Sequence, residues 1–286
     1  PTDGTGLESA SLDIVEGKTI SGIVKLPYGY LAPLGGLDVE ISAGSFYDRV
    51  TIPEGLDHAE YSIHVLPGRA YEIEYRLYDN KNEYVESGFY SNAGTVSDFE
   101  LLTPIEVGDE DVDGIDIDII KGYQIMGKIL LPDSEVASED IYVSVNARGV
   151  TSYGSSTRIE RGFSSADYSI VVPEGDFIVS YNLYENKDFI DRGYYSITGT
   201  LSKREDADSI SIFGKSQENI VLTLLRGNIV HGSIALPGED TFIQGMQYSI
   251  TFTDYSQQLS FNSNNYISIG EKSSSYSIRV PNGEYI

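Results

Sequence analysis

The sequence predicts an all-β protein made of tandem β-sandwich domains with about seven strands each. Three observations predict this class: a repeated segment of about 105 residues, alternation of apolar and polar residues within each copy, and composition. The 286 residues include 29 glycines, 22 tyrosines and no tryptophan, which favours strands and turns over helices. No segment shows a helical period, whereas period two is typical of strands with one buried face.

A short motif near the start of each copy sets the register of the repeat. It reads GKTISGIVKLP from Gly17, GYQIMGKILLP from Gly122 and GNIVHGSIALP from Gly227. Alternate positions such as Gly22 and Val24 share one face of the predicted strand. A glycine on the buried face indicates that another backbone packs close to the strand at that point.

An alternating apolar pair precedes each of these motifs. The three pairs are Leu12 and Ile14, Ile117 and Ile119, and Leu222 and Leu224. We expect the pair to open each unit, with the glycine turning the chain into the next strand. The predicted domains are therefore 9–112, 113–217 and 218–286.

The back half of the unit agrees well between the copies at 61–95 and 168–200. One face of each predicted strand keeps its apolar residues and the other varies, as expected for core and solvent sides. Hairpin turns are predicted at 79–82 and 185–188.

The middle of each copy varies more. One strand is expected there between polar loops, within 39–41, 142–145 and 248–252.

The third copy ends at Ile286, the equivalent of Ile178. It therefore has no counterpart of the later hairpin and last strand, so the third domain is truncated. We expect exposed core surface and open sheet edges there. We also expect the chain to be a fragment of a longer protein, whose third unit is poorly ordered or takes a strand from a neighbour.

The motif I-x-G-x-I/V-x-L-P, followed by Y-S-I-x-V-P-x-G-x-Y and G-Y-Y-S-x-x-G-T, resembles known repeats. These are the transthyretin-like, Ig-like sandwich repeats related to carboxypeptidase regulatory-like domains. The resemblance covers nearly the whole chain. It implies an extracellular, non-catalytic adhesive or accessory module of secreted or surface proteins of Gram-positive bacteria, and it transfers no binding residues.

Charge and composition exclude several classes of function. Nineteen basic and 44 acidic residues give a net charge of -25, which argues against nucleic acid and against anionic membranes as partners. The chain has no cysteine, so disulfides and thiolate metal sites are excluded. No apolar run approaches the roughly 18 residues of a membrane-spanning helix. No catalytic constellation recurs, and the chain is predicted not to be an enzyme.

Four tyrosines are the candidate ligand-binding residues. Tyr78 and Tyr184 point outward by the alternation, and Tyr90 and Tyr195 each follow a glycine by two positions. Exposed aromatic rings could stack on sugars. The alternative is that they are ordinary sandwich residues, with the ring at the edge of the core and the hydroxyl on the backbone.

An acidic run at the first junction between units is the candidate metal site. Asp109, Asp111 and Asp113 crowd carboxylate oxygens where Ca²⁺ could stiffen the array. The spacing does not match an EF-hand loop. The alternative is a solvated acidic linker.

These observations predict a non-catalytic extracellular segment of a bacterial cell-surface protein, acting as an adhesive or spacer module. Its expected partners are glycans, surface proteins of a host or cell wall, and further domains of a longer chain. Two alternatives stay open: a carbohydrate-binding module of a secreted glycoside hydrolase, and an accessory domain of a peptidase.

Overall fold

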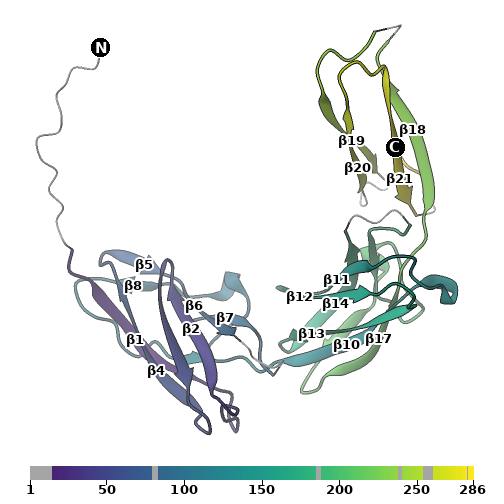
Figure 1. Cartoon of the computed structure of the whole chain (residues 1–286). Helices are drawn as coiled ribbons and strands as arrows, with labels where there is room; N and C mark the ends of the chain where they lie inside the picture. The colour runs from purple at the N-terminus through teal and green to yellow at the C-terminus, as the bar shows by residue number, and fades with distance from the viewer. Residues whose placement is uncertain (1–14, 79–82, 185–187, 238–239, 254–259, 282) are drawn as a thin grey trace, which may run out of the picture. The chain divides into compact units, whose positions relative to one another are not determined.

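The structure of this chain is a computed structural model. It describes residues 15–78, 83–184, 188–237, 240–253, 260–281 and 283–286. The described residues form strands and turns, with no α-helix and three one-turn 3-10 helices among them (Figure 1). The all-β prediction is confirmed. The chain divides into two compact units, Pro1–Gly122 and Tyr123–Ile286.

The first unit is a sandwich of two antiparallel layers closed by one parallel strand. One sheet has the order β4-β1-β9 and the other β3-β2-β6-β7, and β5 pairs with β8. The apolar faces of these strands enclose a single core. The strands are β1 (Lys18–Lys25), β2 (Leu37–Ala43), β3 (Phe46–Ile52), β4 (His58–Val65), β5 (Arg69–Tyr71), β6 (Ile73–Tyr78), β7 (Ser87–Phe89), β8 (Ile105–Val107) and β9 (Ile117–Asp118).

The second unit begins with a complete copy of the same sandwich. Its sheets have the orders β13-β10-β17 and β12-β11-β14-β15, with β16 also pairing with β14. One long strand, β14, replaces the separate β5 and β6, and a second core fills the sandwich. The strands are β10 (Tyr123–Leu130), β11 (Ile141–Arg148), β12 (Ser152–Ile159), β13 (Ser165–Val172), β14 (Gly175–Leu183), β15 (Arg192–Tyr194), β16 (Ser209–Ile212) and β17 (Gln217–Thr223).

The third repeat forms two two-stranded sheets, β18-β21 and β19-β20. Its inward residues Val230 and Ile234 are partly exposed, whereas their counterparts Ile125 and Ile129 are completely buried. Core side chains are thus incompletely covered in this repeat, as its sequence predicts. The strands are β18 (Asn228–Ala235), β19 (Met246–Thr253), β20 (Ser260–Ile267) and β21 (Ser273–Val280).

The position of the closing strand corrects one prediction. Ile117 lies in β9, which runs parallel to β1 with Val24 opposite Ile117, and Leu222 lies in β17, opposite Ile129 of β10. The alternating pair therefore closes the sheet of the repeat before it, and the prediction that it opens the next one was wrong. Because β9 and β10 are close in sequence, they would be expected to pair as a hairpin. Ile117 is instead buried in the first core, and β9 therefore pairs with β1. Leu12 and Ile14 lie outside the described residues.

Three strands were missed where polar loops were expected: β3, β12 and β20. Each pairs antiparallel with the predicted middle strand before it, β2, β11 or β19. They lie at the edge of their sheets, so most of their side chains are exposed or only partly buried and the apolar alternation is weak. The predicted turns at 79–82 and 185–188 lie outside the described residues, apart from Asp188.

A glycine and a tyrosine hold the closing strand at the same place in both complete repeats. Gly22 lies opposite Tyr61 and Gly127 opposite Tyr168. A Cβ atom at Gly22 would lie 2.1 Å from the carbonyl oxygen of Ile115, so only glycine permits this approach. The predicted close backbone contact is confirmed.

The two tyrosines complete this contact from the facing strand. The Tyr61 hydroxyl donates to the carbonyl of Ile115, and the Tyr168 hydroxyl donates to the carbonyl of Ile220 at 2.8 Å. Burial raises the pKa of both hydroxyls, because the phenolate loses its hydration in the core.

Candidate interaction surface

The acidic run at the first junction is used to complete the edge of β1. Asp111 Oδ1 accepts the backbone N–H of Thr19 at 2.8 Å, and Asp116 Oδ1 accepts that of Ile23 at 3.1 Å. Asp113 accepts the hydroxyl of Ser21. Asp111 and Asp116 therefore accept backbone N–H groups of β1 that would otherwise need a carbonyl of a neighbouring strand.

This arrangement bears on the predicted calcium site at Asp109, Asp111 and Asp113. The described residues, which include all three aspartates, contain no group of three or more His, Cys, Asp or Glu side chains placed to hold a metal. Two of the three carboxylates already bind β1. The calcium site stays a prediction, and the geometry does not support it.

The four candidate tyrosines differ in how far they are exposed. Tyr78 is 41% exposed and Tyr184 is 69% exposed, each at the end of a central strand. Tyr90 and Tyr195 are partly buried and pack against the two cores. Their backbone N–H groups donate to Ile73 and Val179, opposite residues whose side chains face inward.

Tyr78 belongs to a cluster on the outer face of the first unit, which we call the tyrosine–arginine face: Glu40, Tyr47, Arg49 and Tyr78. The Arg49 guanidinium carbon lies 5.4 Å from the Tyr47 ring centre and 5.5 Å from that of Tyr78. Arg49 Nε donates to Glu40 at 2.8 Å, and the Tyr78 hydroxyl donates to the same carboxylate at 3.3 Å.

The Arg49 guanidinium is fixed within this face and lies beside a groove. The hydrogen bond from Arg49 to Glu40, followed by the attraction between their charges, raises the pKa of Arg49. The guanidinium is held over two rings by cation–π attraction and by the carboxylate together. A groove of about 310 Å³ runs beside it, lined by Arg49, Tyr78, Asp38 and Thr51 among others.

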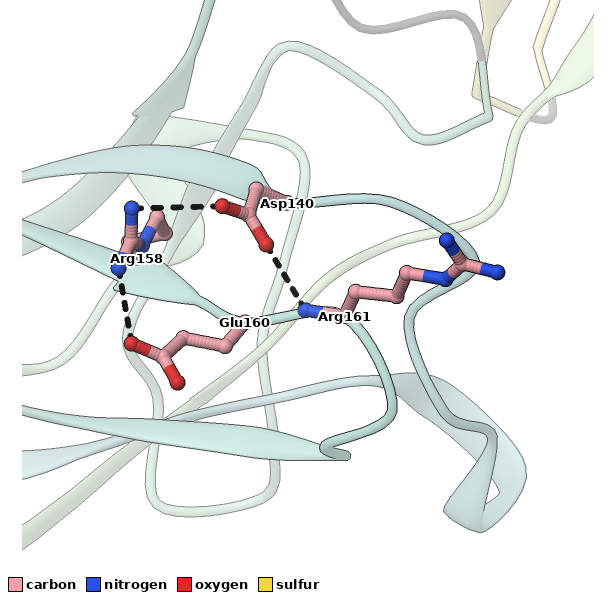
Figure 2. A network of polar contacts seen from close by, with 4 residues as sticks. All are labelled: Asp140, Arg158, Glu160 and Arg161. Carbon is pink, nitrogen blue, oxygen red and sulfur yellow. Dashed lines mark hydrogen bonds and ion pairs between the residues drawn. The ribbon is translucent and has the colours of Figure 1, made fainter.

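The second unit carries a similar combination on the corresponding sheet. Arg158 donates to Glu160 at 2.8 Å and pairs with Asp140 at 3.3 Å, and Asp140 also accepts the backbone N–H of Arg161 at 2.9 Å (Figure 2). The Arg158 guanidinium carbon lies 5.9 Å from the ring centre of Tyr142. Its hydrogen bond to Glu160 is the largest cause of the raised pKa of Arg158.

Sequence reasoning missed the residues that complete these surfaces, Tyr47 and Arg49 in β3 and Arg158 in β12. The signal was present: Tyr47, Arg49 and Thr51 alternate with the apolar Val50 and Ile52. Interpreting these segments as loops hid it, because residues in a loop have no defined face.

No protein-family profile matches the chain, and no curated protein matches it. The chain is similar in structure to a leucine-rich repeat protein from Bacteroides thetaiotaomicron at 13% identity and a TM-score of 0.28, over 73% of this chain and 26% of that one.

It is also similar to the Bacillus anthracis TIE protein, at 8% identity and a TM-score of 0.23, over 93% of this chain and 44% of that one. A candidate adhesin from Bacteroides ovatus matches at 9% identity and a TM-score of 0.29, over 73% and 93%. The chain thus spans less than half the length of the first two proteins.

In the part of the chain that the structure describes, no helix has the length and apolar character needed to cross a membrane.

Proposed function

We propose that this chain is a non-catalytic, extracellular segment of a bacterial cell-surface protein, in which tandem β-sandwiches act as an adhesive or spacer module. One observation carries the proposal: both complete repeats close with the same glycine and tyrosine contact, while their outer faces carry different residues. A constant scaffold with a variable surface suits a module that holds or binds rather than one that catalyses.

The resemblance to transthyretin-like repeats supports a secreted or surface location and a Gram-positive source for this module. The outer faces supply the adhesive part of the proposal, because each complete repeat exposes a tyrosine beside an arginine held by carboxylates. Tyrosine and arginine are, with tryptophan, the side chains enriched at binding hot spots. The proposed partners are glycans or surface proteins.

A second candidate is a carbohydrate-binding module that serves a glycoside hydrolase elsewhere in a longer chain. The specific observation in its favour is the groove beside Tyr78, where an exposed ring adjoins the polar side chains of Asp38, Arg49 and Thr51. Such a groove offers both a stacking platform and hydrogen-bonding groups to a sugar. An accessory role in a peptidase has no feature in its favour here.

Binding assays with matched variants test these functions. The whole chain, Tyr78→Ala and Tyr184→Ala are applied to a glycan array and to immobilised bacterial and host surface proteins. Tyr28→Ala is the control, because Tyr28 is fully exposed and is not part of the tyrosine–arginine face.

The outcomes separate the candidates. Glycan binding that falls about tenfold or more in Tyr78→Ala, but not in Tyr28→Ala, supports the carbohydrate-binding module; a tenfold change is about 1.4 kcal/mol. Saturable binding to surface proteins without glycan binding supports the adhesive module. No saturable binding in any assay contradicts adhesion and leaves the spacer role.

A further inference from the structure

The outer face of the sheet β12-β11-β14-β15 carries a groove of about 700 Å³. One row of residues across its floor contains Asn146, Ser180 and Tyr194, and the next contains Asn182 and Arg192. Along β11 and β14 the residues between them belong to the second core, so these side chains point outward. The lining residues outside the second repeat are Ser260, Phe261 and Asn262 of β20.

Three exposed arginines line this groove. Arg148 ends β11, Arg192 begins β15 and Arg204 begins the 3-10 helix Arg204–Asp206. Among the described residues, none of the three forms an ion pair. Arg192 Nε donates to Asn182 Oδ1 at 2.6 Å. This bond orients the guanidinium and does not use its two terminal amino groups.

Unpaired arginines contrast with the charge of the rest of the chain. The chain has 44 acidic and 19 basic residues, so carboxylate partners are in excess. Three positive arginines less the negative Asp191 and Glu205 give the groove lining a formal charge of +1, within a chain of charge -25. A cleft with its own positive charge concentrates anions. Elsewhere arginines do bind carboxylates: Arg49 binds Glu40, Arg76 binds Glu74 and Arg226 binds Glu135.

The first repeat shows that the fold does not require these arginines. Its strands β2, β6 and β7 pair as β11, β14 and β15 do. By this pairing, and by the matching 3-10 helices, the places of the three arginines are taken there by Gly44, Ser87 and Phe99. The arginines are therefore a feature of the outer surface of the second repeat alone.

We propose that this groove binds an acidic saccharide, whose carboxylate or sulfate groups are held by Arg148, Arg192 and Arg204. The planar guanidinium offers paired N–H donors that match either anion. The side chains of Asn146 and Ser180 on the floor supply partners for sugar hydroxyls. This site rests on the adhesive function proposed above and gives that function a ligand class.

The polarity of the floor favours a saccharide over a protein partner. A protein interface usually centres on apolar or aromatic anchors that fill well-packed pockets. Most side chains that the second repeat contributes to this lining carry nitrogen or oxygen atoms instead. The ring of Tyr184, which is 69% exposed, also lines the groove and offers a flat surface to a sugar.

Calorimetric titration of the whole chain with four probes tests the ligand class. Hexagalacturonate carries only carboxylates and a κ-carrageenan hexasaccharide only sulfates, so the tighter of the two identifies the anion. Cellohexaose is the neutral control, and hexaglutamate is the acidic control that is not a saccharide. We expect saturable binding of at least one acidic saccharide, weaker at higher salt, and binding of both controls at least about tenfold weaker.

Variants of the groove test the site. Arg148→Gln, Arg192→Gln and Arg204→Gln should each weaken binding about tenfold, as loss of a hydrogen bond between charged groups does. Arg161→Gln is the matched control, because it removes the same charge from the same repeat outside the groove lining. Only the backbone N–H of Arg161 takes part in the network of Figure 2. Thermal melting followed by circular dichroism checks that each variant is folded.

The outcomes separate this site from the wider function. Weaker binding in at least two of the three groove variants, with Arg161→Gln unchanged, supports the proposal. It is overturned if fewer variants weaken binding, if a control probe binds as tightly as the acidic saccharides, or if no probe binds. If the whole chain still binds neutral glycans or surface proteins in the array assay, the adhesive function stands without this site. If that assay is also negative, adhesion fails with it.

Discussion

At Gly22 and Gly127 the lack of a side chain decides whether a repeat can close. A methyl group at either position would overlap a backbone carbonyl, which cannot move as a side chain can. Gly22→Ala should therefore destabilise the first unit by about 1–3 kcal/mol, the usual cost of overpacking. Urea unfolding followed by tyrosine fluorescence measures this loss.

The matched control for this substitution is Gly108→Ala. Gly108 has no neighbouring atom within 4 Å of a built Cβ and lies in the same unit. It should unfold within about 0.5 kcal/mol of the wild type. Equal stability of the two variants would show that the closing strand tolerates a displacement.

The buried tyrosines should make the fold sensitive to alkali. Burial raises the pKa of Tyr61, Tyr168 and Tyr181, and it raises the pKa of Tyr84 to about 12. Their ordinary value is 10.0. Since the folded pKa lies above the unfolded one, this contribution to stability is complete below pH 10. It is lost as the pH rises towards the folded values.

Two measurements check this pH dependence. Absorbance at alkaline pH should show a group of tyrosines that ionise only with unfolding. Tyr168→Phe should lower the free energy of unfolding at neutral pH by about 1 kcal/mol, since the carbonyl of Ile220 loses its donor, and should flatten the alkaline decline. An unchanged decline would mean that other groups cause it.

Asp111 provides a test of the two hypotheses for the acidic run. If its carboxylate serves the backbone of Thr19, Asp111→Ala should cost about 1 kcal/mol and millimolar Ca²⁺ should not change the melting temperature. The exposed Asp109 is the control, and Asp109→Ala should be neutral. A calcium-dependent rise in melting temperature that disappears in Asp111→Ala would establish the metal site instead.

At the scale of the element, the sequence predicts strands best where one face is fully buried. The alternation in β1, β10 and β14 identifies them because every second residue faces a core. Edge strands such as β3 and β12 carry little apolar signal, since solvent accepts almost any side chain there. The closing strand was assigned to the wrong repeat because alternation shows that a strand exists but does not show its partner.

At the candidate site, too, alternation predicts which way a side chain points but not which strand lies beside it. Outward orientation of Tyr78 follows from alternation in β6 alone, and that prediction needs no partner strand. Its contact with Arg49 depends on the pairing of β2 with both β3 and β6. Tyr90, just after β7, is partly buried because its backbone N–H pairs with Ile73 of β6, a pairing that the sequence does not specify.

The third repeat should be the least protected part of the described chain. Its strands β18 and β21 pair over the same length as β10 and β13, but they cover a less complete core. Local stability follows buried apolar contact, so amide hydrogens of β18 should exchange faster than those of β10. Hydrogen exchange with mass spectrometry measures both in one sample. Equal protection at low protein concentration would contradict this expectation.

At the scale of the whole molecule, the repeat could be identified from sequence because each copy must bury side chains at the same positions to form its core. Positions that face a core keep their chemistry across copies, whereas outer residues vary freely. The charge of -25 is spread over those outer residues and favours solubility. Which partner the outer faces bind depends on contacts between side chains of neighbouring strands. Alternation of apolar and polar residues along one strand does not predict these contacts.

The parallel closing strand has a mechanical consequence. Because β9 runs parallel to β1, the two ends of the first sandwich leave it in opposite directions along the strands. A pull on these ends loads the backbone hydrogen bonds between β1 and β9 in shear, so all of these hydrogen bonds resist the force together. In a hairpin pulled at its ends, the hydrogen bonds would instead break one at a time. A tether built from such modules would therefore resist the force of flowing liquid. Single-molecule pulling should give higher rupture forces when the force is applied along β1 and β9 than when it is applied across them.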